Sequence, residues 1–175
     1  MRHSARDVGK AGWDKDTGYG ILNVPAALAR RAPAADPQEP NEDVYLVKPK
    51  GLLAAGHAPI TAPHRRNRVI RAHVERAEDP EDVYRVYLPE KGRLVVTVRT
   101  TANVDLEVWG RHTRTVFERG AAARRDLLGT AAHPGSRFER VTIRGRGVAQ
   151  YVYVDVFLPK GVRQASYSVS VSARR

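Results

Sequence analysis

The feature that most restricts the fold is a series of short segments in which apolar and polar residues alternate. In residues 83–88, for example, Tyr84, Val86 and Leu88 fall on one face and the intervening residues on the other. A period of two predicts a β-strand with one buried face. Further segments of this kind continue to residue 172, separated by turns that contain Gly or Pro. The sequence therefore predicts an all-β domain.

The alternating pattern predicts about seven or eight strands, over residues 44–47, 69–74, 83–88, 93–99, 104–109, 138–144, 150–158 and 166–172. The turn Pro89–Gly92 predicts a hairpin between the third and fourth of these segments. Residues 111–134 are interpreted as irregular, and no helical pattern follows Pro33. Many short strands joined by turns are typical of an antiparallel β-sandwich of jelly-roll type.

Composition excludes several classes of protein and site. The chain has 175 residues, a formal net charge of +11 and no cysteine, which excludes disulfides and thiolate metal sites. No apolar run approaches the ~20 residues of a membrane span. Most of the excess charge is Arg at the polar positions of predicted strands, so a solvated Arg-rich face is favoured over a nucleic-acid groove. The N-terminus also lacks the apolar segment of a signal peptide.

The chain divides into three parts by composition: residues 1–33, a Pro-rich linker over 34–48, and the β-sandwich over 49–175. In the first part, Asn23 is a good N-cap residue and Pro25 suits the first turn of a short helix over 26–31. So short a segment cannot bury a core, because independent folding usually needs more than roughly 40 residues. We therefore interpret it as a loop-helix remnant of a larger domain.

Residues 5–28 resemble the C-terminal end of a subtilisin-like serine protease (subtilase) domain, an α/β fold. The order that carries the resemblance is Gly12-Trp-Asp, Gly18-Tyr-Gly, Asn23 and then Ala26-Ala-Leu. The resemblance implies that the catalytic Asp, His and Ser lie in a missing upstream peptidase domain. The Gly-Thr-Ser nucleophile segment of that family is absent, and Ser136 lies in an unrelated Pro-Gly-Ser-Arg context. We therefore expect no catalysis by this chain and assign it no catalytic residue.

Residues 36–175 resemble the bacterial pre-peptidase C-terminal (PPC) domain, a β-sandwich module that follows the catalytic domain of many secreted proteases. The segments that carry the resemblance, in order, are Glu39-Pro-Asn-Glu-Asp43, Asp79-Pro-Glu-Asp-Val-Tyr84, Val104-Asp-Leu-Glu-Val-Trp109, Tyr151-Val-Tyr-Val-Asp155 and Tyr167-Ser-Val-Ser-Val171. The resemblance implies a secreted or extracellular location.

Two acidic segments of the chain could supply ligands to a hard cation. Residues 39–43 provide one cluster of side-chain oxygens and residues 78–82 another, and calcium takes six to eight oxygen ligands. The resemblance to calcium-binding members of the module family implies the following metal ligands: Glu39, Asn41, Glu42, Asp79 and Asp82. Pro37 and Gln38 stand where those members carry a further acidic ligand. The alternative is that these residues only cap turns and solubilise the linker.

Together these patterns predict the non-catalytic C-terminal part of a secreted subtilisin-like serine endopeptidase, with calcium as the expected cofactor. The module would aid folding or stability of the protease, or bind protein substrate. The alternative is a stand-alone binding module for an insoluble polymer, either collagen or polysaccharide. Five aromatic residues face away from the predicted core, for which core packing is favoured over ligand binding: Tyr87, Trp109, Tyr151, Tyr153 and Phe157. Nucleic-acid binding rests on net charge alone, and we expect no nucleic-acid partner.

Overall fold

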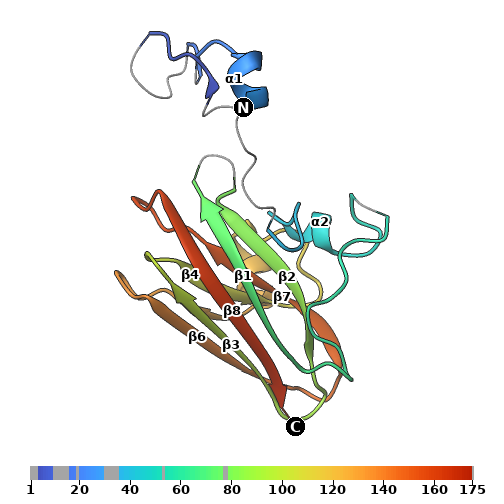
Figure 1. Cartoon of the computed structure of the whole chain (residues 1–175). Coiled ribbons are helices and arrows are strands. Elements are labelled where there is room, and N and C mark those ends of the chain that lie inside the picture. The colour runs from blue at the N-terminus through green and yellow to red at the C-terminus, as the bar shows by residue number, and fades with distance from the viewer. Residues whose placement is uncertain are drawn as a thin grey trace. The chain divides into compact units, whose positions relative to one another are not determined.

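The computed structural model describes residues 4–9, 16–18, 20–29, 36–52, 54–76 and 79–174. The chain forms two compact units, Met1–Ala35 and Asp36–Arg175 (Figure 1). In the first unit, α1 (Val24–Ala29) is a short helix. The Asn23 side chain accepts a hydrogen bond from the Ala26 amide at 3.0 Å, which confirms the predicted N-cap. Most of the Gly12–Gly20 motif lies outside the described residues.

The second unit is a sandwich of two four-stranded antiparallel sheets. Its strands are β1 (Asn67–Glu75), β2 (Glu81–Leu88), β3 (Arg93–Thr100), β4 (Asp105–Trp109), β5 (Leu127–Ala131), β6 (Phe138–Arg144), β7 (Gln150–Phe157) and β8 (Gln164–Arg174). One sheet has the order β1-β8-β3-β6 and the other β2-β7-β4-β5. Successive strands alternate between the two sheets except at β4 and β5, which are neighbours in one sheet. This is the jelly-roll arrangement, so the predicted fold class is confirmed.

The core lies between the two sheets, and the predicted alternation places its residues correctly. Tyr84, Val86 and Leu88 of β2 face inward, and so do the inward residues of β1, β3, β4, β7 and β8. Strand β7 was the longest apolar segment of the sequence, and it lies inside its sheet between β2 and β4. An apolar strand is best placed where neighbours cover both of its edges.

The predicted hairpin between residues 83–88 and 93–99 is wrong. Strand β2 pairs with β7, whereas β3 pairs with β6 and β8 in the opposite sheet. The turn at Pro89–Gly92 therefore carries the chain from one sheet to the other. Alternation could not distinguish the two arrangements, because both bury the same inward residues. Sequence adjacency favours a hairpin, but the long-range partners β7 and β8 provide the pairing.

Residues 44–47 form a helical turn, α2 (Val44–Val47), where the sequence suggested a strand. Asp43 caps this turn by accepting a hydrogen bond from the Val44 amide at 2.7 Å. Val44 and Val47 then pack on the outer face of the second sheet, in a cluster with Val83, Trp109, Val116 and Tyr153. This second cluster explains why Trp109 and Tyr153 face away from the main core and are still buried, and it confirms a packing role for these two aromatics.

Residues 111–134 are more ordered than expected, because they contain α3 (Gly120–Asp126) and β5. Strand β5 shows no alternation, and Gly129 gives the physical reason. A Cβ atom at this position would lie 2.9 Å from side-chain atoms of both Val141 and Ile143. Glycine therefore allows the edge strand to approach β6 across the sandwich.

The segment expected as a linker over 34–48 is, from Asp36 onward, part of the second unit. No helix in the described part of the chain has the length and apolar character needed to cross a membrane.

Candidate metal centre

The segment that precedes α2 folds back on itself and docks on the sandwich. The Asp36 carbonyl accepts a hydrogen bond from the Glu39 amide at 3.5 Å. Pro37 and Gln38 occupy the middle of this turn, and Gln38 has a φ of 82°. Proline followed by a residue with positive φ is the pattern of a type II turn. The Asp36 carboxylate accepts a hydrogen bond from the His73 amide, so the first residue of the turn is held at β1.

Asn41 attaches the segment to the start of β2. Its side chain is fully buried, and its Nδ2 donates to Asp82 Oδ1 at 2.9 Å. The Val83 amide donates to the Asn41 carbonyl at 2.7 Å. These contacts bring residues 36–43 beside the acidic turn that precedes β2.

Asp82 lies at the end of the core and connects the two sheets. Its Oδ2 accepts a hydrogen bond from the Tyr167 hydroxyl of β8 at 2.5 Å. The hydroxyls of Tyr84 and Tyr167 lie 2.6 Å apart. Burial raises the pKa of Asp82 well above its usual value, as do the nearby carboxylates of Asp79 and Glu39. Both Asp82 oxygens therefore have partners, and Asp82 is placed to hold Asn41 and Tyr167 in position.

Three carboxylates converge beside Asn41. Asp36, Glu39 and Asp79 each present one oxygen, and these oxygens lie within 4.8 Å of one another. Two oxygens that bind one calcium ion at 2.3–2.6 Å are at most about 5 Å apart. The three oxygens are therefore close enough to share a single cation.

Four oxygens of the segments 39–42 and 79–82 are buried and have no hydrogen-bond partner: Glu39 Oε1, Asn41 Oδ1, Glu42 Oε2 and Asp79 Oδ1. Buried polar atoms nearly always have a partner. Glu39 and Asp79 belong to the converging group, where a cation or ordered water would supply the missing partners. Carboxylate and amide oxygens are the ligands that calcium and magnesium prefer.

The electrostatics of the cluster also favour a cation. Burial raises the pKa of Asp79 to about 7, and the charges of Glu39 and Asp36 add to this shift. Burial likewise raises the pKa of Glu39, with further contributions from Glu42 and Asp36. In the described part of the chain, no Lys or Arg forms an ion pair with these carboxylates. A bound divalent ion would neutralise the repulsion among them.

Of the five residues predicted as ligands, Glu39 and Asp79 lie within metal-binding distance of each other, together with Asp36. Glu42 and Asp82 are not part of this group, which is the one such group among the described residues. Glu39, Asn41, Glu42 and Asp79 each offer an oxygen without a partner, whereas the Asp82 oxygens accept hydrogen bonds from Asn41 and Tyr167. Asp36 joins the cluster although the sequence interpretation did not select it. The sequence signal was available, because Asp followed by Pro is typical of the first two positions of a turn.

A second acidic group lies on the outer face of the sheet β2-β7-β4-β5, around the buried Asp155 of β7. Burial and the charges of Glu81 and Glu107 raise the pKa of Asp155 well above its usual value, and burial raises that of Glu81 to about 7. These carboxylates do not converge to metal-binding distance within the described residues, where the Asp36 group alone meets that criterion.

Ser136 is engaged in a turn. Its hydroxyl donates to the Phe138 carbonyl at 2.6 Å and accepts from the Phe138 amide at 3.0 Å. A serine nucleophile instead needs a hydrogen bond to a general base. The Ser136 hydroxyl therefore has a structural role here.

Among known proteins, the chain is similar to solved structures and not to any family model or curated sequence. The pre-peptidase C-terminal domain of a collagenase from Bacillus anthracis is similar at 11% identity and a TM-score of 0.47, over 61% of this chain and 90% of that one. PliG from Aeromonas hydrophila, a periplasmic inhibitor of g-type lysozyme, is similar at 13% identity and a TM-score of 0.43, over 66% of this chain and 93% of that one. At these values neither similarity identifies a function for this chain.

Proposed function

We propose that this chain is a non-catalytic β-sandwich accessory module in which a calcium ion joins the segment 36–43 to the sandwich. The observation that carries the proposal is that oxygens of Asp36, Glu39 and Asp79 lie within 4.8 Å of one another. Glu39 and Asp79 also each have a buried oxygen without a hydrogen-bond partner. Glu39, Asn41, Glu42 and Asp79 would be ligands, together with Asp36. The ion would connect a segment that precedes α2 with the turn that precedes β2.

The role of this ion would be structural. It would be bound by the folded state and not by the unfolded chain, so it would stabilise the fold by mass action. The oxygens come from two segments about forty positions apart in the sequence, which only folding brings together. Calcium in the surroundings would thus determine how stably the segment 36–43 is held.

The test is thermal unfolding of the full chain with and without calcium. At a calcium concentration 100 times the dissociation constant, we expect about 2.7 kcal/mol of stabilisation. For a domain of this size, the melting temperature should then rise by roughly 5–10 °C. Magnesium at the same concentration should have a smaller effect, because it requires a stricter octahedral geometry.

Two variants make the test specific. Glu39→Gln should abolish most of the calcium response, because it removes one carboxylate from the cluster. Glu90→Gln, which changes an exposed carboxylate in the turn between β2 and β3, serves as the matched control and should respond like the original chain. An unchanged melting temperature at millimolar calcium would argue against the site.

We further propose that the module is the C-terminal part of a secreted subtilisin-like serine endopeptidase, where it aids folding or stability of the protease. The support is the order of motifs in residues 5–28 and the sandwich that follows them. The test is the genomic sequence upstream. An open frame that encodes a Gly-Thr-Ser-x-Ala segment about one domain length before residue 1 is expected, and a stop codon directly upstream would contradict it.

A further inference from the structure

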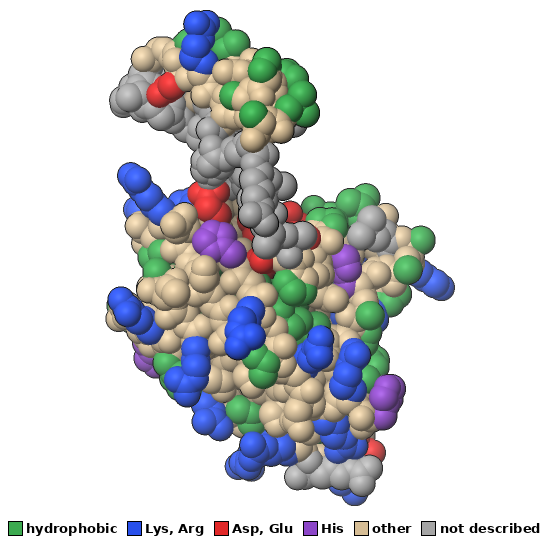
Figure 2. Space-filling view, viewed as in Figure 1, with side chains coloured by type: hydrophobic (Ala, Val, Ile, Leu, Met, Phe, Trp, Pro, Cys, Tyr) green, Lys and Arg blue, Asp and Glu red, His purple; other side chains and the backbone are tan. Residues whose placement is uncertain are grey.

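The outer surface of the sheet β1-β8-β3-β6 is a cationic face. Its outward positions carry six exposed arginines: Arg71 on β1, Arg93 and Arg99 on β3, Arg140 and Arg144 on β6, and Arg174 on β8. Among the described outward positions of these strands the one carboxylate is Glu75, at the end of β1 that pairs with Asp79. In Figure 2 blue side chains spread over this face, while most of the red ones gather at the end of the sandwich near the metal centre.

Strand register places three of these arginines in one row. Arg93 of β3 pairs with Arg174 of β8 on one side and with Arg144 of β6 on the other. Like charges directly opposite each other destabilise a sheet. None of the three forms an ion pair with a residue that the structure describes. They also line a shared depression of about 500 Å³ together with Lys91. The repulsion within this row therefore destabilises the sheet slightly. The three guanidinium groups are available to bind an anion.

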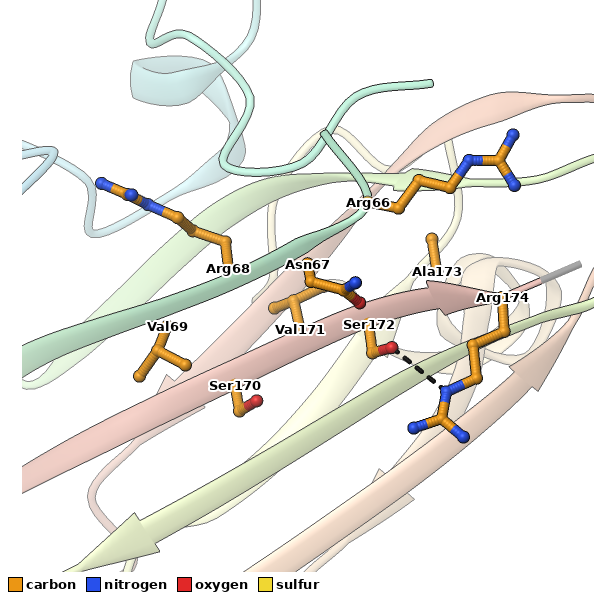
Figure 3. Close-up of a pocket in the computed structure, with 9 residues that line it drawn as sticks. All are labelled: Arg66, Asn67, Arg68, Val69, Ser170, Val171, Ser172, Ala173 and Arg174. Carbon is orange, nitrogen blue, oxygen red and sulfur yellow. Dashed lines mark hydrogen bonds between the residues drawn. The ribbon is translucent and has the colours of Figure 1, made fainter. Parts of the chain in front are cut away.

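A lane of hydroxyl groups runs between the arginines. The outward positions of β8 from residue 166 to residue 172 are all serine: Ser166, Ser168, Ser170 and Ser172. Ser170 and Ser172 border an open depression of about 850 Å³, with Asn67 and Val69 of β1 on its other side (Figure 3). Arg174 lies at the end of this depression and donates to Ser172 Oγ at 3.3 Å. Serine hydroxyls and the Asn67 amide can both donate and accept hydrogen bonds.

The dimensions of the face fit an extended polymer. Arg93 and Arg99 are six residues apart on β3, which corresponds to about 20 Å along the strand. On the neighbouring strand β6, Arg144 lies opposite Arg93, and Arg140, opposite Thr97, marks an intermediate point. Guanidinium groups bind carboxylates and sulfates through paired hydrogen bonds. A chain that carries regularly spaced anions and many hydroxyls matches both the arginines and the serine lane.

Nucleic acid matches the face less well. Single-stranded nucleic acid is bound largely by stacking bases on exposed aromatic rings. Phe138 is the one aromatic at the described outward positions, and the Arg99 guanidinium lies over its ring at 5.1 Å. Sequence readout of a duplex requires an element that enters a groove, whereas this face is the broad side of a four-stranded sheet. Bilayer insertion would require projecting apolar side chains, and of the large apolar residues only Val69 and Phe138 are exposed here.

We propose that the outer face of β1-β8-β3-β6 binds an acidic polysaccharide. The row Arg174–Arg93–Arg144 provides the strongest anion contacts, and the serines of β8 contact the sugar hydroxyls. This proposal does not depend on calcium binding, because the arginines and serines of the face are not among the candidate metal ligands.

The experiment measures binding of the full chain to heparin, a sulfated polysaccharide, and to polygalacturonate, a carboxylated one. Titrations over a series of NaCl concentrations in the presence of EDTA keep any effect of calcium separate. The triple variant R93Q/R144Q/R174Q should bind about tenfold more weakly or worse, because each lost contact is a charge-assisted hydrogen bond. Its salt dependence should also be shallower, by about one unit of slope per lost contact.

The matched control is R111Q/R114Q/R124Q, which removes the same charge from exposed arginines outside the face. It should bind within about twofold of the original chain. The variant R93K/R144K/R174K retains the charge but not the paired geometry, and intermediate binding is expected. Melting temperatures establish that each variant is folded.

Three outcomes would overturn the proposal. If R93Q/R144Q/R174Q and R111Q/R114Q/R124Q weaken polysaccharide binding equally, the binding is an effect of net charge alone. Absence of binding to both polysaccharides at low salt would remove the face as a polysaccharide site. Tighter binding to duplex DNA or to vesicles of anionic lipid than to either polysaccharide, with the same loss in R93Q/R144Q/R174Q, would assign the face to a different class of partner.

Discussion

Asp79 is half-buried among other carboxylates, and this position links its ionisation to folding. In the calcium-free protein its pKa is raised from the ordinary value of 3.8 to about 7. Between these two pH values the folded state retains a proton that the unfolded state has lost. The free energy of unfolding should therefore decrease as the pH rises from about 4 to about 7.

Asp79→Asn should flatten this pH dependence in EDTA, because the titrating group is gone. At pH 8 without calcium the variant should be more stable than the original chain by about 1 kcal/mol, a value reduced for the partial exposure of the side chain. With calcium present the order should reverse, because the variant lacks a ligand. Urea unfolding from pH 4 to 8 measures both effects. A variant that is less stable in EDTA at pH 8 would contradict the repulsion described here.

Substitutions of Tyr167 and Tyr84 test the hydrogen bonds that these two hydroxyls form next to Asp82. The single hydroxyl proton of Tyr167 is donated to Asp82 Oδ2, so Tyr84 is the donor in the bond between the two hydroxyls. Tyr167→Phe leaves a buried carboxylate oxygen without a donor and should cost about 2–3 kcal/mol. Tyr84→Phe removes a bond between neutral groups and should cost about 1 kcal/mol. Chemical denaturation of both variants measures these losses in the free energy of unfolding. An equal loss in both variants, or a larger loss in Tyr84→Phe, would mean that the hydrogen bond from Tyr167 to Asp82 contributes no more than the bond between the two hydroxyls.

At the scale of elements, Asp43 connects α2 with the loop that follows β4. Its Oδ1 accepts hydrogen bonds from the Val44 amide at 2.7 Å and from the Val116 amide at 2.9 Å. Asp43→Ala should destabilise the protein by about 2 kcal/mol, because two amides lose their acceptor. Asp43→Asn should recover most of this loss, since asparagine is an equally good N-cap residue.

Hydrogen exchange distinguishes the two contributions of Asp43. Faster exchange of the Val116 amide in Asp43→Ala, with near-normal exchange in Asp43→Asn, is the expected pattern. If both variants exchange alike, the contact between Asp43 and the loop is not what orders residues around Val116.

Apolar alternation along the chain located most of the strands but not every element. Strong alternation located β1–β4 and β6–β8, and it identified their inward faces. It did not locate β5, where Gly129 interrupts the pattern, nor α2, whose apolar Val44-Tyr-Leu-Val47 run resembles a strand. In both places a contact with a distant part of the chain decides the local conformation, and local sequence carries little information about such contacts.

At the scale of the whole molecule, the sandwich has its own core and its own candidate metal centre within residues 36–175. A chain of residues 36–175 should therefore unfold cooperatively, with a melting temperature and a calcium response close to those of the full chain. A chain that begins at Val44 should lose the calcium response and melt at a lower temperature, because Asn41 and its hydrogen bonds are removed. Scanning calorimetry with and without calcium tests this. Failure of the longer piece to fold would mean that residues 1–35 contribute to its stability.

The charges of the sandwich are distributed unevenly. The formal net charge is +11, yet carboxylates gather at the candidate metal centre and arginines cover the outer face of β1-β8-β3-β6. The sequence interpretation placed the arginines at outward strand positions but could not show that Arg93, Arg144 and Arg174 share a row. That row depends on the pairing of β3 with both β6 and β8.

The sequence by itself determined the fold class and the inward face of most strands, because both follow from a period of two along the chain. It also identified the acidic segments from which the candidate ligands come. Only the tertiary structure decided which strands pair, that β2 and β3 belong to different sheets, and that Asp36 joins Glu39 and Asp79. These are contacts between residues distant in sequence. They depend on how two sheets pack against each other, and a single local pattern is compatible with several such packings.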